Sequence, residues 1–353
     1  MDERSGDVMR EVRPGDDRVR TLVKIAVQLV GFVAGLGLLG WCAREALKPG
    51  NREQLARLGE ADGGQVALLF ACSLATLALN GLIFWAVLLP ERRLKIGDTL
   101  ATNAFATMLA YLPFKISVVA RVALHNRRDG VALMTIAAWF GAIGALVIVG
   151  LGPVSLVSLW RKGVDGVWWI ASGAGIALSL GLLLAAARAL AGERGLARIH
   201  RLLDPLRIGA LTRFTRTEMF AKLHGVFGML AHPGAVLGAT ALRLADVGVL
   251  SARFMVAASI LGVSLGWEEG VLFASSYFLI GMLSPFGMLG TREAGSMGVA
   301  AALGFGDAGE SVAVVILLVT ATESLSYLVA GVLGGVWVRP DRLIRGAKAA
   351  ASL

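Results

Sequence analysis

Long apolar runs, separated by shorter polar segments, dominate the chain. Each run is continuous rather than alternating, and each reaches or exceeds the roughly 20 residues that a helix needs to cross a bilayer. A spanning segment must satisfy its backbone hydrogen bonds internally, so continuous runs of this length predict helices and not strands. The runs are 22–43, 65–89, 131–158, 167–190, 235–262 and 311–338. The pattern therefore predicts an all-α polytopic membrane protein.

Two further apolar segments, 99–128 and 271–305, are each divided by a proline. Each segment holds two arms of roughly a dozen residues, which are too short to span a bilayer comfortably. Pro113 divides the first segment and Pro285 the second, and proline cannot continue the hydrogen-bond ladder of a helix. We predict about six full transmembrane helices plus two re-entrant hairpins. Eight ordinary helices, two of them short, are the alternative.

Lysine and arginine indicate the orientation, because basic loops stay on the cytoplasmic side of a membrane. Basic residues collect in 1–24, 90–98, 188–234 and 339–353. The loop 44–64 is ambiguous, since it holds as many acidic as basic residues. Placing both termini in the cytoplasm puts all the strongly basic segments on the inside.

With this orientation, the order helix, helix, hairpin, helix occurs twice, and the hairpin enters first from the inside and then from the outside. Both hairpins contain Pro-Phe, followed some residues later by Arg121 or Arg292. This order predicts an inverted-topology repeat, which in transporters places the substrate site near the membrane midplane.

The domain organisation follows from these segments. We expect cytoplasmic tails at 1–21 and 339–353 and a single transmembrane domain at 22–338, with repeat halves at about 22–160 and 167–338. Leucine and phenylalanine stripes alternate with arginines in 191–234. This pattern is typical of an amphipathic segment that lies on the membrane surface, here the cytoplasmic one.

Composition agrees with a membrane protein and narrows the chemistry. Charged residues make up 17% of the chain and hydrophobic residues 56%, against about 25% and 45–50% in soluble domains. The net charge of +9 then marks loops that face anionic lipid rather than a nucleic-acid site. Two cysteines and four histidines lack the spacing of a disulfide framework or a metal site. We expect no metal, no cofactor and no nucleic-acid partner.

The stretch "SPFGMLGTREAGSMG", residues 284–298, combines broken backbone with charge between two apolar runs. A lone charge in the membrane costs several kcal/mol unless it is paired or hydrated. Glycines let the backbone approach a ligand, and the second arm begins near Thr291, so its N-terminus and Arg292 suit a phosphate. The candidate substrate-binding residues here are Pro285, Gly287, Gly290, Arg292 and Glu293. A structural Arg-Glu pair is the alternative.

Other charged residues inside the apolar segments are candidates as well. We add Arg121 and Pro113 of the first hairpin as substrate-binding residues, although Arg121 is also placed to snorkel to the interface. A second set is predicted to couple charge: Arg243, Asp246, Arg253 and Glu323. Arg243 and Asp246 are i,i+3 neighbours that can pair. Glu323 can pair with Arg253 or Arg292, as a titrating group or as part of a structural ion pair.

The stretch "SPFGMLGTREAGSMGVAAALGF", residues 284–305, resembles the proline-, glycine- and Arg-Glu-containing region of the lysylphosphatidylglycerol synthase transmembrane family, also called flippase-like domain proteins. "YLPFKISVVARVALHNRRDG", residues 111–130, is similar to the first-half segment of that family. Length and helix count also match over most of 20–340. Two departures stand out: 114–116 lack the usual glycine after the proline, and Glu323 stands where a basic residue is expected.

The resemblance implies a lipid-moving membrane domain, with its functional residues at Pro285, Gly287, Gly290, Arg292, Glu293 and Arg121. The chain ends about fifteen residues after its last predicted helix, so we expect no aminoacyl-transferase domain and no synthesis of lysyl lipid.

We predict a lipid flippase or transporter, and not an enzyme, in the bacterial cytoplasmic (inner) membrane. It would move an anionic or glycosylated, lipid-linked headgroup, so its partner is a membrane phospholipid or a lipid-linked substrate. Two alternatives stay open: an intramembrane transferase acting on a lipid-linked sugar, and a non-transporting membrane partner of a lipid-biosynthesis enzyme. The lipid, the direction, the energy source and the oligomeric state are open.

Overall fold

The structure, a computed structural model, describes residues 14–161, 164–203, 205, 209–284, 288–302 and 308–340, and these ranges contain helices and no strand. Within these ranges six helices are long and apolar enough to cross a membrane, so the chain is an all-α polytopic membrane protein, as predicted. They are α1 (Pro14–Ala46), α3 (Gly63–Leu88), α6 (Leu133–Trp160), α7 (Gly166–Leu190), α12 (Pro233–Ile260) and α15 (Ala308–Val338).

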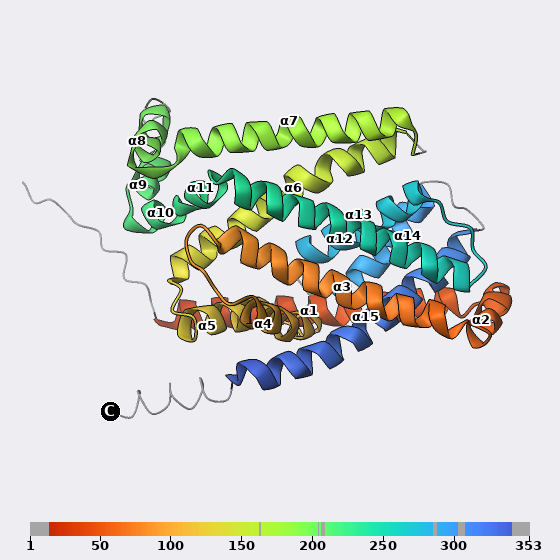
Figure 1. Ribbon diagram of the computed structural model, residues 1–353. Helices are drawn as coiled ribbons and strands as arrows, with labels where there is room; N and C mark the ends of the chain where they lie inside the picture. Colours follow the sequence, from red (N-terminus) through yellow and green to blue (C-terminus); the bar gives the residue numbers. More distant parts are fainter. Residues whose placement is uncertain are drawn as a thin grey trace, which may run out of the picture.

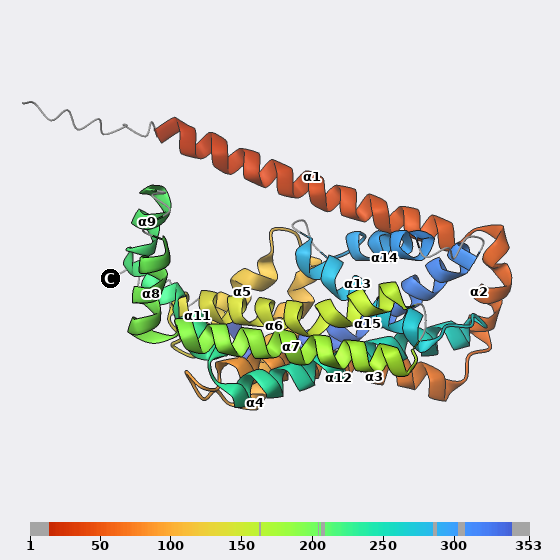
Figure 2. The same ribbon diagram turned by 90° about the horizontal axis from the view of Figure 1, so that it is seen from above.

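The long helices lie side by side in one bundle (Figure 1). The start of α1 and the end of α15 lie at the same end of this bundle, which is what six crossings require. The connection between α1 and α3, formed by η1 (Pro49–Asn51) and α2 (Arg52–Gly59), lies at the other end. Seen from above, the first half of α1 diverges from the other helices (Figure 2).

Both proline-divided segments consist of short helices. The first contains α4 (Ile96–Met108), η2 (Leu109–Tyr111) and α5 (Ile116–Arg127), and the second contains α13 (Trp267–Leu283) and α14 (Thr291–Ala302). The four α-helices are 12 to 17 residues long. At about 1.5 Å per residue each is roughly 18 to 26 Å long, which is less than the ~30 Å hydrocarbon core. Pro285 and Gly287, at the second break, lie outside the described residues.

The first break is built without glycine. Leu112 has extended backbone, and Phe114 and Lys115 then adopt φ values of 66° and 48°. These left-handed conformations reverse the chain between η2 and α5. The missing glycine noted in the sequence is thus replaced by two strained L-residues.

In its described residues the predicted amphipathic segment contains four short helices: α8 (Gly192–Leu203), α9 (Gly209–Thr215), α10 (Glu218–Leu223) and α11 (Gly225–Leu230). Its interruptions have local causes. Pro205 follows α8, and Thr217 caps α10 by accepting a hydrogen bond from the Phe220 N–H at 3.2 Å. In both views α8 and α9 lie across the long helices, at the end where α1 begins (Figures 1 and 2).

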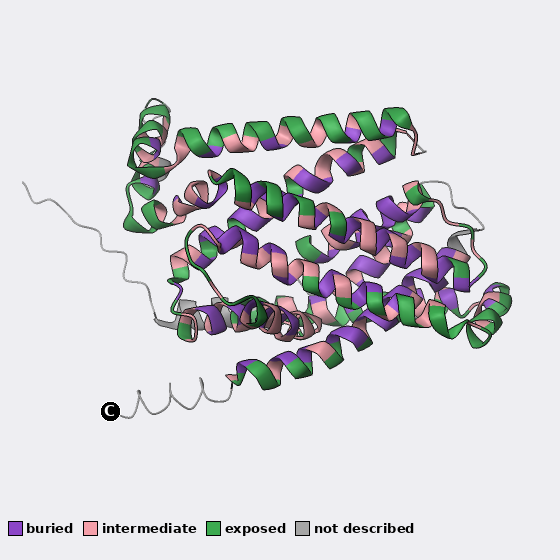
Figure 3. Ribbon diagram, in the orientation of Figure 1, coloured by how far each residue is buried: buried purple, intermediate pink, exposed green. Residues whose placement is uncertain are grey.

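Burial differs from that of a soluble domain in two ways: large apolar side chains are exposed, and several charged side chains are buried in a core that is otherwise mostly hydrophobic. The outward face of α7 is largely exposed (Figure 3) and carries Trp169, Ile170 and Leu178. By contrast, Arg253 and Glu293 inside the bundle are 0% exposed. Apolar side chains that would be unfavourable in water are suited to lipid, whereas buried charges must find partners within the protein.

Candidate functional site

A cavity of about 350 Å³ lies inside the bundle, lined by residues of α3, α4, η2, α5, α6, α12, α13, α14 and α15. Five of the predicted charged residues line it together: Arg121, Arg243, Arg253, Arg292 and Glu323. The first and the fourth come from the two proline-divided segments. The structure therefore brings residues that lie far apart in the sequence to one place.

The cavity lies at mid-depth of the long helices. Glu323 stands near the middle of the spanning part of α15, Ser311–Val338. Asp246 stands near the middle of α12. With a rise of about 1.5 Å per residue, each carboxylate is roughly 20 Å from either end of its helix. Charges at this depth are far from both membrane surfaces, so snorkelling cannot relieve them.

Glu323 is the centre of a buried ion-pair network. Its Oε1 accepts from Arg292 Nη1 at 2.5 Å, and its Oε2 accepts from Arg253 Nη2 at 2.5 Å. The Tyr111 hydroxyl adds a longer hydrogen bond to Oε1, at 3.3 Å. The sequence predicted Arg253 or Arg292 as the ion-pair partner of Glu323, and in the structure Glu323 pairs with both. Glu323 thereby joins α12, α14 and α15 with η2 through fully desolvated charge-assisted bonds.

Glu293 caps its own helix. Its Oε2 accepts the Gly290 backbone N–H at 2.6 Å, while its Oε1 accepts from Arg292 Nε at 2.9 Å and from the Thr320 hydroxyl at 3.0 Å. A carboxylate three residues into a helix that bonds back to the preceding N–H is half of a capping box. The N-terminus of α14, which was expected to face a phosphate, thus already donates to a carboxylate of the chain.

Gly290 and Arg292 have different surroundings. Gly290 has φ +80°, and a Cβ built on it would lie 1.7 Å from the Gly35 carbonyl oxygen of α1. Its lack of a side chain serves contact with α1. Arg292 is 1% exposed and lies over the Tyr277 ring, with 4.4 Å between the guanidinium carbon and the ring centroid. Arg292 lines the cavity, as does Met288 of the same stretch, so Arg292 is the charged residue of this stretch that can contact a ligand there.

The second ion pair lies on α12. Arg243 Nη1 donates to Asp246 Oδ2 at 2.6 Å, as the i,i+3 spacing predicted. Asn80 Nδ2 from α3 donates to the same oxygen at 3.3 Å. The Arg243 guanidinium lies over the Phe278 ring at 4.4 Å. Both charged groups are almost fully buried, so neither reaches the membrane surface.

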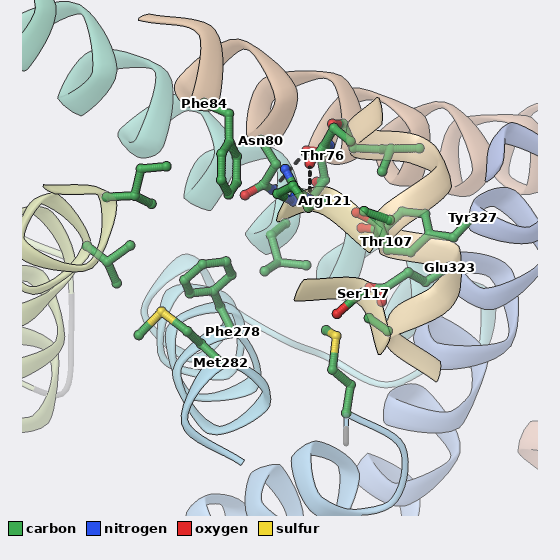
Figure 4. A pocket seen from close by; sticks show the side chains of 18 of the residues that line it. Thr76, Asn80, Phe84, Thr107, Ser117, Arg121, Phe278, Met282, Glu323 and Tyr327 are labelled. Carbon is green, nitrogen blue, oxygen red and sulfur yellow. Dashed lines mark hydrogen bonds between the residues drawn. The ribbon is translucent and has the colours of Figure 1, made fainter. Parts of the chain in front are cut away.

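Arg121 is held differently. Its Nη2 donates to Asn103 Oδ1 at 2.8 Å, and its guanidinium carbon lies 3.9 Å from the Phe84 ring centroid. The side chain is largely buried, with 7% of the residue exposed. In the described ranges no carboxylate lies within ion-pair distance of it. Figure 4 shows Arg121 across the cavity from Phe278. A cation–π contact and one amide therefore stabilise this charge.

The charges around the cavity do not cancel. Among the residues that the structure describes, Asp246, Glu293 and Glu323 pair with three of the arginines, and Arg121 is left over. Each arginine also keeps one buried nitrogen without a hydrogen bond: Arg121 Nη1, Arg243 Nε, Arg253 Nε and Arg292 Nη2. Unsatisfied buried donors cost free energy, and anionic oxygens are the acceptors that suit guanidinium groups. The cavity is therefore suited to an anion.

Several lining residues were not singled out from the sequence. Asn80 and Asn103 carried a signal, since an amide within an apolar run must find a partner in the membrane. Phe84, Tyr277 and Phe278 carried none, because aromatic residues are common in membrane helices. Their role under the guanidinium groups depends on helix packing alone. Of the remaining candidates, Pro113 lies at the break before α5, and Pro285 and Gly287 are outside the described residues.

A comparison with protein families matches residues 28–334 to the family described as the lysylphosphatidylglycerol synthase TM region. Searches of curated proteins and of solved structures give no match. The matched range runs from α1 to α15, so it includes both proline-divided segments and every residue of the ion-pair network. The match spans most of the 353 residues, and the chain therefore belongs to the lysylphosphatidylglycerol synthase TM region family.

Proposed function

We propose that this protein translocates a membrane lipid by passing its anionic headgroup through the arginine-lined cavity. One observation carries the proposal. A cavity at mid-depth of the spanning helices is lined by four buried arginines, and each has an unsatisfied nitrogen. Such charges are costly in a membrane protein unless a ligand or a pathway uses them. The acyl chains remain in the bilayer while the headgroup occupies the cavity.

We propose further that the two proline-divided segments are re-entrant hairpins of an inverted repeat. The helix contacts support a pseudo-twofold relation that exchanges α1 with α7, α3 with α12, and α6 with α15. Thus α3 contacts α4 as α12 contacts α13, and α1 contacts α15 as α7 contacts α6. The extensive contact between α3 and α12 then lies on the axis. Arg121 and Arg292 are the arginines that the two hairpins bring to the shared cavity.

The ion-pair network offers a way to admit and release a phosphate. A headgroup phosphate that approaches Arg253 and Arg292 competes with Glu323 for the same guanidinium groups. Because Glu323 also accepts from Tyr111, it retains a partner when an arginine turns to the phosphate. The arginines can therefore exchange Glu323 for the phosphate while Glu323 keeps a hydrogen-bond donor, which lowers the cost of separating the buried ion pair.

We place the protein in the bacterial cytoplasmic membrane with both termini in the cytoplasm. The support is the position of α8 and α9, whose exposed Arg198, Arg201 and Arg213 lie at the end of the bundle where α1 begins. Basic residues of this kind favour the cytoplasmic surface with its anionic lipids.

The proposal is tested by headgroup translocation in proteoliposomes that contain fluorescent phospholipid. Arg121 is the residue to change, because Arg121→Gln removes a cavity charge without separating an ion pair. Loss of one charge-assisted hydrogen bond, worth about 1.5–3 kcal/mol, predicts translocation that is slower by about 10- to 100-fold. Arg127→Gln is the matched control, since Arg127 is an exposed arginine on the same helix.

Arg292→Ala is a second variant, but it also removes a partner from Glu293 and Glu323. Its melting temperature must therefore be measured beside its transport rate. Absence of translocation in the wild-type protein, or a wild-type rate in a folded Arg121→Gln variant, contradicts the proposal. A rate that falls equally in Arg127→Gln contradicts the assignment of the cavity as the pathway.

A further inference from the structure

The charge of the cavity limits which headgroups it can accept. With three arginines paired and Arg121 unpaired, the described lining and its direct partners carry one excess positive charge. A ligand with a single negative charge brings the cavity to neutrality. A neutral or zwitterionic headgroup leaves the excess charge in place, and a cationic headgroup adds to it, in surroundings where water screens poorly.

Among the described residues that line the cavity, no carboxylate is free to receive an ammonium group. Glu323 is the carboxylate that lines the cavity, and both of its oxygens already accept from arginine. Glu293 is held by Arg292, Thr320 and a backbone N–H. Asp246 pairs with Arg243 through Oδ2, and although its Oδ1 has no hydrogen-bond partner, Asp246 is not among the residues that line the cavity. An aminoacylated or ethanolamine headgroup would therefore have to break an existing ion pair to place its ammonium.

Uncharged polar groups are available instead. Thr107 of α4 and Ser117 of α5 line the cavity, and neither hydroxyl makes a hydrogen bond with any described residue. Figure 4 shows both on the same side of the cavity as Arg121. A hydroxyl can donate and accept, so it is a natural partner for the hydroxyls of a polyol.

The volume of the cavity indicates the size of headgroup that it holds. Its volume of about 350 Å³ is near the lower end of the ~300–1,000 Å³ range for small-molecule sites. One phosphate with a small polyol or a single sugar suits this volume, and an oligosaccharide exceeds it. The aromatic rings of Phe84 and Phe278 border the cavity opposite one another (Figure 4) and make these parts of its wall apolar.

From these four observations we infer that the cavity selects a lipid with one phosphodiester charge and a small uncharged polyol headgroup, and discriminates against lipids that carry an ammonium group. Arg121 is the residue that determines this specificity. The inference rests on the proposed function, since it names the substrate class of the same cavity.

The experiment compares three probes with the same fluorescent acyl chain in proteoliposomes of the full chain: phosphatidylglycerol, phosphatidylethanolamine and lysylphosphatidylglycerol. We expect phosphatidylglycerol to move about tenfold faster than either of the others, a difference that corresponds to one favourable charge interaction. In Arg121→Gln the cavity becomes neutral, so the ratio of phosphatidylglycerol to phosphatidylethanolamine transport should fall towards one. Arg127→Gln should keep the wild-type ratio.

Binding of the same three probes to detergent-solubilised protein separates this inference from the proposed function. If no probe moves but phosphatidylglycerol binds preferentially and Arg121→Gln removes the preference, transport is overturned and the specificity stands. If all three probes move at the same rate, transport stands and the specificity is overturned. Faster movement of lysylphosphatidylglycerol, or an unchanged ratio in a folded Arg121→Gln variant, also overturns it.

Discussion

Phe114 and Lys115 occupy backbone conformations that favour glycine. Their φ values of 66° and 48° lie in the left-handed region, where an L-residue costs roughly 1–2 kcal/mol. Replacing Phe114 with glycine removes this strain, and the greater flexibility of the unfolded chain offsets part of the gain. We predict that Phe114→Gly stabilises the protein by about 1 kcal/mol, measured as a rise in melting temperature in detergent.

Leu112 provides the control for this prediction. It is an exposed apolar residue two positions away, with φ −87°, so it has no left-handed strain to relieve. Leu112→Gly should lower stability by about 0.5–1 kcal/mol through backbone entropy alone. Equal effects of the two substitutions would show that loss of the exposed side chain, and not φ, determines the stability of this break.

At the residue scale, the sequence identified charges better than their partners. Arg243 with Asp246 was predicted from i,i+3 spacing, because local spacing on one helix fixes that distance. Glu323 was linked to both of its arginines as alternatives. The capping role of Glu293 was not foreseen, although a glutamate near the start of an arm is the usual signal. Asn103 as the partner of Arg121 depends on how α4 packs against α5, which residue type alone does not reveal.

The contact between α1 and the start of α14 is an interaction between two elements that depends on two glycines. A Cβ on Gly290 would lie 1.7 Å from the Gly35 carbonyl oxygen, and a Cβ on Gly35 would lie 2.9 Å from the Leu289 carbonyl oxygen. A flexible side chain can change its rotamer to relieve such a clash, but backbone atoms cannot. We predict that Gly290→Ala destabilises the protein by about 2–3 kcal/mol, from the clash together with φ +80°.

Gly298→Ala is the matched control on the same helix. Gly298 lies within α14, and a Cβ there meets no atom within 4 Å. Alanine at a helical position is favoured over glycine by about 0.5–1 kcal/mol, so this variant should be neutral or more stable. The two melting temperatures are compared in the same detergent. If Gly290→Ala melts at the temperature of Gly298→Ala, the close approach to α1 does not contribute to stability.

At the element scale, the sequence predicted where the long helices lie and where the two proline-divided segments are interrupted. It did not predict how the segment 191–234 divides into short helices. Each of the six predicted runs coincides with a long helix, because length and hydropathy suffice to identify a spanning segment. Pro113 and Pro285 indicated the interruptions, because proline lacks the backbone N–H that a helix needs and this can be recognised from the residue type alone. The division of the described part of 191–234 into four helices depends on helix caps such as Thr217. The leucine and phenylalanine stripes in the sequence do not show where such caps lie.

At the scale of the whole molecule, the exterior is apolar, and the largely apolar interior also contains a cluster of buried charged residues. Spanning helices that are apolar almost all round carry no marked face, so their sequence does not specify which neighbour they contact. The cavity therefore could not be predicted as a shape. Its charges could, because Arg253, Asp246 and Glu323 within apolar runs had to face the bundle interior. The helix packing determines which arginines have a carboxylate partner, and it leaves Arg121 without one among the described residues.

The topology of the bundle gives the last prediction, which distinguishes a re-entrant first hairpin from two spanning helices. Single cysteines are introduced at Glu91, Glu60 and Phe114 after Cys42 and Cys72 are replaced by alanine. Glu91 follows α3, at the end of the bundle where α1 begins, and Glu60 follows α2, at the other end. A membrane-impermeant maleimide should label these two positions from opposite sides of sealed vesicles.

A cysteine at position 114 should react slowly from either side if α4 and α5 form a hairpin. The two arms are roughly 18–20 Å long, so the break would lie within the hydrocarbon core, where a thiol does not readily ionise. We expect labelling about tenfold slower than at position 91. If α4 and α5 each span the membrane, the break emerges on the far side, and position 114 should label rapidly from the side that labels position 60. That result would contradict the hairpin and, with it, the inverted repeat.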